Sequence, residues 1–278
     1  MPRLAAATAA DQSRQFMLPQ GEQHFVQTVF PVNIHAMPLG VIRAICFDLD
    51  NTLWDVEPVL MRAERILADW LGHRYPRIGE RFTPADVLEV RAALLAEQPH
   101  QAHDLSFMRR ETLARCAADV GYKRDIANEA FAVWHSARNQ VEPYGEVIAA
   151  LENLKARFRL ATLTNGNADL AVIGLAGHFE VTLNAGTLGF AKPDPRAYIS
   201  LAAALTLEPA EILFVGDEPH ADVVGPRAVG MQTVWVNRSG AAWPDDLPAA
   251  DASVADFDEL MALLGGKTVN SAPSPGPG

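Results

Sequence analysis

The 278-residue sequence has two cysteines, no cluster of basic residues and no long apolar run. Cys46 and Cys116 fall in apolar stretches, which is typical of a reducing compartment without disulfides. The net charge of −11 argues against a nucleic-acid partner, because a phosphate backbone is bound by clustered Lys and Arg. No apolar run approaches the roughly 18 residues needed to span a bilayer, and the N-terminus lacks the apolar stretch of a secretory signal. We therefore expect a cytoplasmic protein with no membrane partner.

The two ends of the chain differ in composition from its middle. Residues 1–36 are polar and mixed and show no clear periodicity, so we expect a flexible N-terminal extension. Residues 265–278 are rich in Gly, Pro and Ser and cannot bury apolar surface, so we expect a disordered tail. The folded part of the protein should lie between these two segments.

A helical block interrupts the folded part soon after its first strand. Residues 41–47 form an apolar run, broken only by Arg43, that suits a strand buried on both faces. From residue 58 to residue 141 the pattern is helical, with Thr83 and Pro84 as the N-cap and first position of one helix. We expect an all-helical inserted domain over 58–142, with four helices at 59–71, 84–97, 104–120 and 125–138.

After Pro143-Tyr144-Gly145 the pattern alternates between strand and helix. This alternation predicts a parallel sheet with helices on both faces. The expected strands are 158–163, 181–183, 212–215 and 233–236, and the expected helices are 145–157, 167–175, 194–205 and 220–229. The fold class is therefore α/β, a doubly wound Rossmann-like sheet formed by residues 37–57 and 143–264, with the helical domain inserted between them.

Two aspartates follow the first strand. Side chains two residues apart point the same way at a strand end, so Asp48 and Asp50 should project together beyond the sheet edge. Two carboxylates this close repel unless a proton or cation neutralises one, and a hard cation such as Mg²⁺ prefers oxygen ligands. A solvated turn after a strand is the alternative for an isolated pair of this kind.

Polar residues follow three later strands as well. Thr164, Asn165 and Gly166 can hydrogen-bond a phosphate, although such a sequence also makes a common turn. Lys192 is the only lysine between Lys155 and Lys267, and its ammonium could neutralise carboxylates and phosphate. Asp217 could complete a Mg²⁺ site with Asp48 if their strands are neighbours, whereas Asp222 suits either that site or a helix N-cap.

In this order, and each at a strand's carboxyl end, these motifs resemble those of the haloacid dehalogenase superfamily of phosphotransferases. The matching residues are Asp48-Leu49-Asp50-Asn51-Thr52-Leu53, Thr164, Lys192-Pro193, and Gly216-Asp217 with Asp222. The resemblance implies a Rossmann-like core, and the helical block corresponds to the family's C1-type cap. It implies a phosphatase that hydrolyses a small phosphorylated metabolite.

The resemblance also implies a role for each residue. Asp48 is the nucleophile that forms an aspartyl-phosphate, and Asp50 is the acid and base. Mg²⁺ is held by Asp48, the backbone carbonyl of Asp50 and Asp217. Thr164 and Lys192 complete the catalytic set, and Asn165, Gly166 and Asp222 support the phosphate and metal site.

Residues of the helical block narrow the resemblance further. The residues concerned are His103-Asp104, Arg109-Arg110 and Trp134, together with 164–167. They are similar to residues of the bacterial phosphatases that act on 5-amino-6-(5-phospho-D-ribitylamino)uracil, which also accept sugar phosphates and nucleotides. The candidates for substrate contact are Trp54, His103, Arg109 and Trp134. Structural roles are the alternative: Trp134 suits helix packing, Asp104 suits an N-cap, and the adjacent Arg109 and Arg110 cannot both face one ligand.

Single residues argue for or against the other activities of the superfamily. Asp50 counts against a haloacid dehalogenase, which needs no acid at that position. A phosphonatase needs a lysine in the cap, where this sequence has Lys123 alone, just after a helix stop. A phosphotransferase or phosphomutase uses the same core residues. A protein that binds a phosphorylated ligand without turnover would lack Asp48, Asp50 or Lys192. The sequence leaves the oligomeric state open.

Overall fold

Six parallel strands form one sheet in the order β3-β2-β1-β4-β5-β6. The computed structural model describes residues 42–265, so the predicted extension over 1–36 and all but the first residue of the predicted tail lie outside it. The first strand in the chain lies in the middle of the sheet, between β2 and β4. The strands are β1 (Ala44–Phe47), β2 (Arg159–Thr164), β3 (Val181–Asn184), β4 (Ile212–Gly216), β5 (Gln232–Val236) and β6 (Ala252–Val254).

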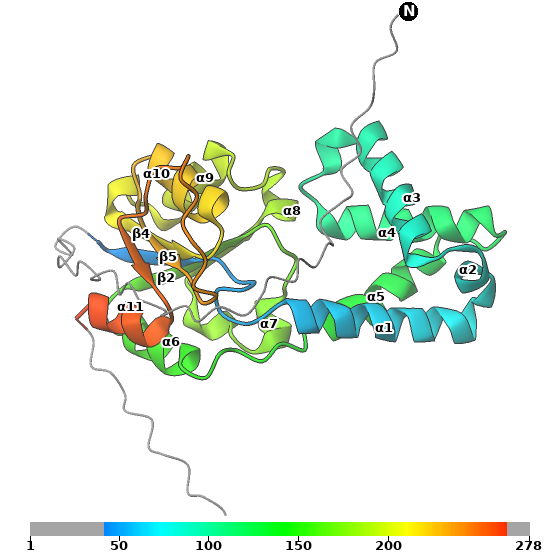
Figure 1. Cartoon of the computed structure of the whole chain (residues 1–278), viewed down its shortest axis with the longest axis horizontal. Coiled ribbons are helices and arrows are strands. Elements are labelled where there is room, and N and C mark those ends of the chain that lie inside the picture. The colour runs from blue at the N-terminus through cyan, green and yellow to red at the C-terminus, as the bar shows by residue number, and fades with distance from the viewer. Residues whose placement is uncertain (1–41, 266–278) are drawn as a thin grey trace, which may run out of the picture. The chain divides into compact units, whose positions relative to one another are not determined.

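The sheet is covered by helices on both faces (Figure 1). Alternate residues of β1 enter different apolar clusters, Ile45 and Phe47 on one face and Ala44 and Cys46 on the other. This explains why all four residues of β1 are apolar, since a strand with both faces buried has no polar side. One face packs against α6 (Val147–Lys155) and α11 (Phe257–Leu263), and the other against α9 (Pro195–Leu205).

A helical insert, defined here as α1–α5, lies in the chain between β1 and α6. Its members are α1 (Glu57–Arg74), α2 (Pro76–Arg81), α3 (Pro84–Glu97), α4 (Leu105–Asp119) and α5 (Ile126–Arg138). The insert has an apolar cluster of its own, built mainly from α1, α4 and α5. All four predicted helices are present, and Thr83 caps α3 as predicted, accepting from Asp86 N. The short helix α2 was not predicted.

The two connections to the insert run side by side. Trp54 forms an antiparallel bridge with Pro143, and Tyr144 N donates to Leu53 O at 3.0 Å. Arg238, which follows β5, adds a third tie: Nη2 donates to Thr52 O, and the guanidinium lies over the Tyr144 ring. The chain therefore enters and leaves the insert at the same place on the sheet domain.

Several predicted elements of the sheet domain differ in extent. The helix expected over 167–175 is the single turn α7 (Leu170–Ile173). The helix expected over 220–229 is a π-helical segment, Pro219–Val224, that continues directly into α10 (Gly225–Ala228), where Pro226 is the second residue. The turn α8 (Ala185–Leu188), the edge strand β6 and α11 were not predicted. Within residues 42–265, no helix is both long enough and apolar enough to cross a membrane.

Candidate active site

The predicted motifs meet at one edge of the sheet because their strands are neighbours. Phe47 is in register with Thr162 of β2 and Val215 of β4, so the residues that follow these positions reach the same level. Asp48 N donates to Val215 O at 2.9 Å, which fixes the backbone of Asp48 beside β4. Thr164 ends β2, and Asp217 directly follows β4. The carboxyl edge of an open parallel sheet is where ligands bind in folds of this kind.

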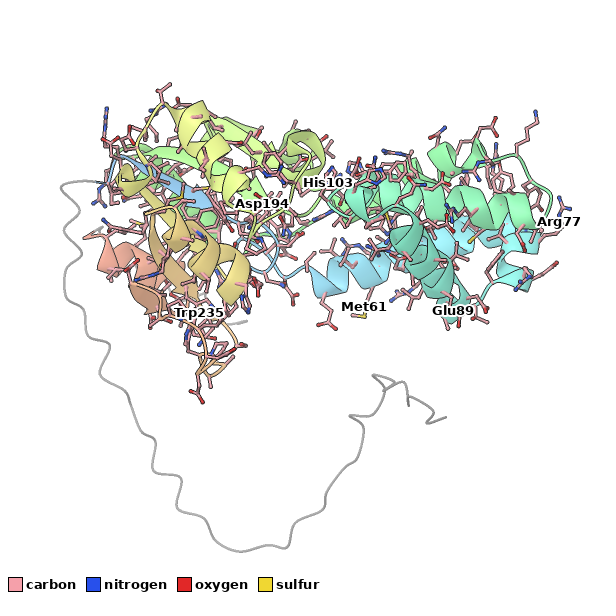
Figure 2. All side chains as sticks on the ribbon, turned by 90° about the horizontal axis from the view of Figure 1, so that it is seen from above. Met61, Arg77, Glu89, His103, Asp194 and Trp235 are labelled. Carbon is pink, nitrogen blue, oxygen red and sulfur yellow. The ribbon has the colours of Figure 1, made fainter. Side chains whose placement is uncertain are left out.

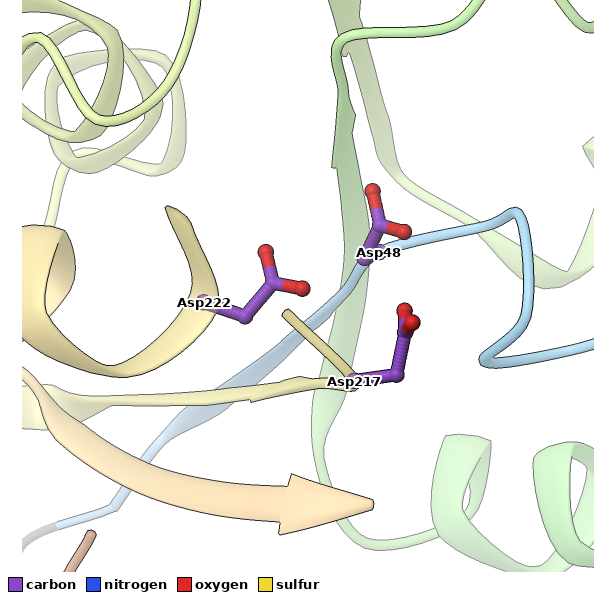
Figure 3. Close-up of side chains that lie close together, drawn as sticks. All are labelled: Asp48, Asp217 and Asp222. Atoms are coloured by element: carbon purple, nitrogen blue, oxygen red, sulfur yellow. The ribbon is translucent and has the colours of Figure 1, made fainter. Parts of the chain in front are cut away.

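Three carboxylates gather at this edge. Asp48, Asp217 and Asp222 each offer an oxygen within 4.8 Å of the others, and Figure 3 shows them at the ends of β1 and β4 and on the segment after β4. Asp48 and Asp222 are buried, and Asp217 is half-buried. Thr52 Oγ1 donates to Asp217 Oδ1 at 3.0 Å. A compact set of carboxylate oxygens suits Mg²⁺, so these residues could hold the predicted metal.

Lys192 lies between two of these carboxylates. Its buried ammonium donates to Asp48 Oδ1 and to Asp222 Oδ1, both at 2.7 Å. Asn165 holds the backbone of Lys192 from both sides: Nδ2 donates to Lys192 O, and Lys192 N donates to Oδ1, each at 2.8 Å. Asn165, predicted to support the phosphate site, thus uses both ends of its amide to place the lysine.

Asp222 is committed to the protein on both oxygens. Oδ1 accepts from Lys192, and Oδ2 accepts from the backbone N–H of Glu218 at 2.9 Å. Asp222 therefore orients the ammonium and the loop after β4, in addition to contributing negative charge to the cluster. Of its two sequence-based alternatives, the structure places it with the acidic cluster, and Glu218 is the N-cap of the following segment.

Burial and crowding shift the pKa values of this cluster. Burial raises the pKa of Asp48 to about 8, against the opposing effect of the Lys192 charge. Burial, with the nearby Asp222 charge, raises the pKa of Asp217 to about 6. Burial alone would lower the pKa of Lys192, but the Asp222 and Asp48 charges outweigh it and raise that pKa. One lysine does not balance three carboxylates, so the site favours a further positive charge.

Asp50 is held apart from this cluster by two donors. Trp54 Nε1 donates to Asp50 Oδ1 at 2.8 Å. Arg138 Nη2, from the last residue of α5, donates to Oδ1 at 2.8 Å and to Oδ2 at 2.6 Å. Gly166 makes this approach possible, because a Cβ there would lie 2.7 Å from Asp50 Oδ2 and 3.3 Å from Arg138 Nη2.

Arg138 was missed by the sequence analysis, although a signal was present. It lies at four-residue spacing from Ile126, Ala130 and Trp134, all on the buried stripe of α5. An arginine that continues an apolar stripe at the end of a helix indicates a buried ion pair, because a buried charge needs a partner.

A cavity of about 490 Å³ lies next to the site, between the sheet domain and the insert. Leu49 and Thr164 line it, so it adjoins the site next to Asp48 and Asp50, and its walls mix polar and apolar side chains. The insert contributes Asp104, Ser106, Arg110 and His135, and the sheet domain contributes Asn167, Asp169, Asn184 and Thr187 among others.

The four candidates for substrate contact do not line this cavity. Trp54 is fully buried and holds Asp50. Trp134 packs in the insert and donates to Glu64, and Arg109 pairs with the same glutamate while lying 3.8 Å from the Trp134 ring centre. His103, labelled in Figure 2, lies on the loop before α4. The neighbours of two candidates line the cavity instead, Asp104 beside His103 and Arg110 beside Arg109.

Comparison with known proteins agrees with this geometry. Residues 42–230 match the haloacid dehalogenase-like hydrolase family. The chain is 34% identical over 206 residues to the 5-amino-6-(5-phospho-D-ribitylamino)uracil phosphatase YigB of Escherichia coli, covering 72% of this chain and 85% of that protein. It is 27% identical over 237 residues to human N-acylneuraminate-9-phosphatase, covering 82% and 96%.

Solved structures include both phosphatases and dehalogenases. A 2-haloacid dehalogenase from Pseudomonas syringae pv. Tomato DC3000 is 37% identical, with a TM-score of 0.76 over 81% of this chain and 98% of that one. A HAD phosphatase from Thermococcus onnurineus is 25% identical, with a TM-score of 0.59 over 82% and 100%. The resemblance and the α/β fold predicted from the sequence are both confirmed. The chain belongs to the haloacid dehalogenase-like hydrolases.

Proposed function

We propose that the protein is a Mg²⁺-dependent phosphatase that hydrolyses a small phosphorylated metabolite through an aspartyl-phosphate on Asp48. The observation that carries this proposal is the placement of Asp50. A carboxyl group two residues from the nucleophile is placed for both proton transfers: in its protonated form it can give a proton to the alcohol leaving group, and the carboxylate that remains, held by Trp54 and Arg138, can then take a proton from water. A halide leaves without a proton, so a dehalogenase has no use for such a group.

In this mechanism each residue has a defined role. Asp48 attacks phosphorus, a bond forms between its carboxylate oxygen and phosphorus, and the ester P–O bond breaks. Asp50 gives a proton to the departing alcohol, then takes one from the water that attacks the aspartyl-phosphate, releasing inorganic phosphate and regenerating Asp48. The Thr164 hydroxyl and Gly166 orient phosphoryl oxygens, and Lys192 offsets their charge.

The carboxylates of Asp48 and Asp217 and the backbone carbonyl of Asp50 would hold Mg²⁺. The acidic cluster supplies the oxygen ligands that this ion prefers. When bound, Mg²⁺ would polarise a phosphoryl oxygen and offset negative charge in the transition state. The charge of Mg²⁺ would also offset the excess of three carboxylates over one lysine.

The cavity indicates the kind of leaving group. Its lining has one arginine, several hydroxyl and amide groups and two carboxylates, which suits a polar group with several hydrogen-bonding positions. Similarity to the Escherichia coli phosphatase supports 5-amino-6-(5-phospho-D-ribitylamino)uracil, an intermediate of riboflavin synthesis, or a related sugar phosphate or nucleotide. The same core residues would also serve a phosphotransferase or phosphomutase.

Hydrolysis of a chromogenic phosphate ester tests the proposed reaction. We expect Mg²⁺-dependent release of phosphate that is removed by chelation and abolished in Asp48→Asn. Asp256→Asn is the matched control, because Asp256 is the N-cap of α11 and has no part in the acidic cluster, and Asn caps equally well. Halide release from a 2-haloacid with no phosphate release from any ester would overturn the proposal.

A panel of phosphorylated metabolites then tests the substrate. We expect the highest kcat/KM for the ribitylamino compound, with sugar phosphates and nucleotides lower. A clear preference for nucleoside monophosphates would contradict the riboflavin assignment, and transfer of the phosphoryl group to a second sugar in place of water would identify a phosphotransferase.

A further inference from the structure

The deepest charged residue of the insert is Arg138. Its side chain is 2% exposed, although it ends a helix, and its closest partner belongs to the sheet domain. Burying a guanidinium costs several kcal/mol unless partners replace its water. Two nitrogens of Arg138 have such partners. Nη2 donates to both oxygens of Asp50, and Nε donates to Asn167 Oδ1 at 3.2 Å.

The third nitrogen of Arg138 has no such partner. Nη1 is buried and has no hydrogen-bond acceptor among residues 42–265. A buried donor left unpaired destabilises a protein, which makes it a natural point of contact for an anionic ligand. Asn167, the partner of Nε, lines the cavity, whereas Arg138 itself does not, and a Cβ on Gly166 would lie 3.3 Å from Arg138 Nη2 and 3.2 Å from Thr164 Oγ1. The guanidinium therefore lies between Asp50, the cavity wall and the hydroxyl expected to bind phosphate.

The two oxygens of Asp50 depend differently on the insert. Oδ1 accepts from Trp54 as well as from Arg138, whereas Arg138 is the one donor to Oδ2 among residues 42–265. Trp54 precedes α1 and Arg138 ends α5, so the Oδ2 bond exists only while α5 is seated on the sheet domain.

We propose that Arg138 is a positioning residue for Asp50 and binds the anionic substrate, with Nη2 orienting the Asp50 carboxylate and Nη1 donating to an oxygen of the phosphorylated substrate. Seating of the insert then does two things at once: it encloses the substrate and it orients the group that acts on the leaving oxygen. The positioning role rests on the proposed phosphatase activity. The substrate contact requires only that the site binds an anion.

Kinetics of Arg138→Met and Arg138→Lys test the first part. We expect kcat for a chromogenic phosphate ester to fall about 100-fold in Arg138→Met, the size typical of one lost active-site donor. We expect Arg138→Lys to recover part of the loss. The matched control is Arg124→Met, an exposed insert arginine whose partner, Glu111, belongs to the insert as well, and it should retain wild-type kcat.

Two readouts separate positioning from folding. Millimolar guanidinium chloride should restore activity to Arg138→Ala, whereas equal sodium chloride should not. In an Asp50→Asn background, Arg138→Met should cost much less than its 100-fold effect in the wild type, because the two residues act as one unit. Full additivity, or a kcat for Arg138→Met within about threefold of wild type, would overturn the positioning role.

Binding of inorganic phosphate tests the second part without turnover. In the presence of Mg²⁺, we expect Arg138→Met to weaken phosphate binding by about tenfold, the equivalent of one hydrogen bond to a charged group. Unchanged phosphate affinity would overturn the substrate contact. A wild type that binds phosphate through Arg138 but hydrolyses no ester would overturn the proposed function and leave the anion site in place.

Discussion

At the scale of single residues, the site has more negative than positive charge, with three carboxylates and one ammonium. Lys192 donates to Asp48 and Asp222 at the same distance of 2.7 Å, and Asp217 accepts from a neutral hydroxyl. Asn165 fixes the lysine backbone, so the side chain starts from a set position beside both acids. Lys192 therefore offsets part of the negative charge of the three carboxylates, and a proton or a metal ion offsets the rest.

This balance predicts how stability depends on pH and Mg²⁺. In the absence of metal, the folded chain holds protons with pKa values of about 8 on Asp48 and about 6 on Asp217, against an ordinary value of 3.8. Raised pKa values stabilise the fold at low pH, and this stabilisation is lost as pH rises through 6 and then 8. Mg²⁺ replaces those protons, so it should raise Tm more at pH 8 than at pH 5.

Calorimetry with and without Mg²⁺ at both pH values measures this effect. Asp217→Asn is the informative variant, because it removes one titrating group and one expected metal ligand while keeping the size of the side chain. We expect a smaller Mg²⁺ effect on its Tm at pH 8. A Tm increase of equal size at pH 5 and pH 8 in the wild type would contradict the link between proton and metal.

At the scale of elements, close packing after β4 requires a glycine. Gly225 begins α10, and a Cβ at this position would overlap the hydroxyl of Tyr198 in α9 and lie 2.7 Å from Cζ. The Tyr198 hydroxyl cannot move freely, because it is buried and donates to Ala221 O at 2.6 Å. The contact between α9 and α10 thus depends on the absence of one methyl group.

Gly225→Ala should therefore destabilise the fold by about 1–3 kcal/mol, the usual cost of overpacking a core. Gly72→Ala is the matched control, since Gly72 lies inside α1 with open space around its Cβ position. That change should be neutral or stabilise the protein by up to about 1 kcal/mol, because Ala favours helix over Gly. Urea denaturation of both variants measures the difference, and similar free energies of unfolding would show that the α9–α10 contact is loose.

Elements with long patterns were predictable from sequence, and short ones were not. The run at 41–47 and the periodic helices of the insert carry enough residues to reveal their period, and they appear as β1 and α1, α3, α4 and α5. The strand β6 has three residues and is held by pairing with β5, which leaves no period to read. The same holds for the single turns α7 and α8.

The site divides in the same way. Residues after strands were predictable because sheet topology brings strand ends together, and Asp48, Thr164, Lys192 and Asp217 all lie at the carboxyl edge. Contacts from the insert depend on the direction of single side chains. Adjacent helix residues point about 100° apart, and it is Arg110 that lines the cavity while Arg109 packs on Trp134.

At the scale of the whole molecule, the insert and the sheet domain are built as separable units. Each has its own apolar cluster, and both connections pass through one place where Tyr144 N donates to Leu53 O. We propose that 58–142 is a cap that folds around its own core, and that 37–57 with 143–264 forms the catalytic domain. The three carboxylates of the acidic cluster and Lys192 all lie in the second unit.

This division predicts the result of removing the insert. When residues 55–142 are replaced by a short Gly-Ser linker, the flanking Trp54 and Pro143 are already paired, so the sheet should fold and unfold cooperatively. Mg²⁺ binding should persist, because Asp48 and Asp217 remain, and Asp217→Asn in the shortened chain should weaken it. Hydrolysis of a phosphate ester should fall by about 100-fold or more, since Arg138 and part of the cavity wall are lost. A shortened chain that does not fold would show that the sheet domain depends on the insert, and one with full activity would show that Asp50 acts without Arg138.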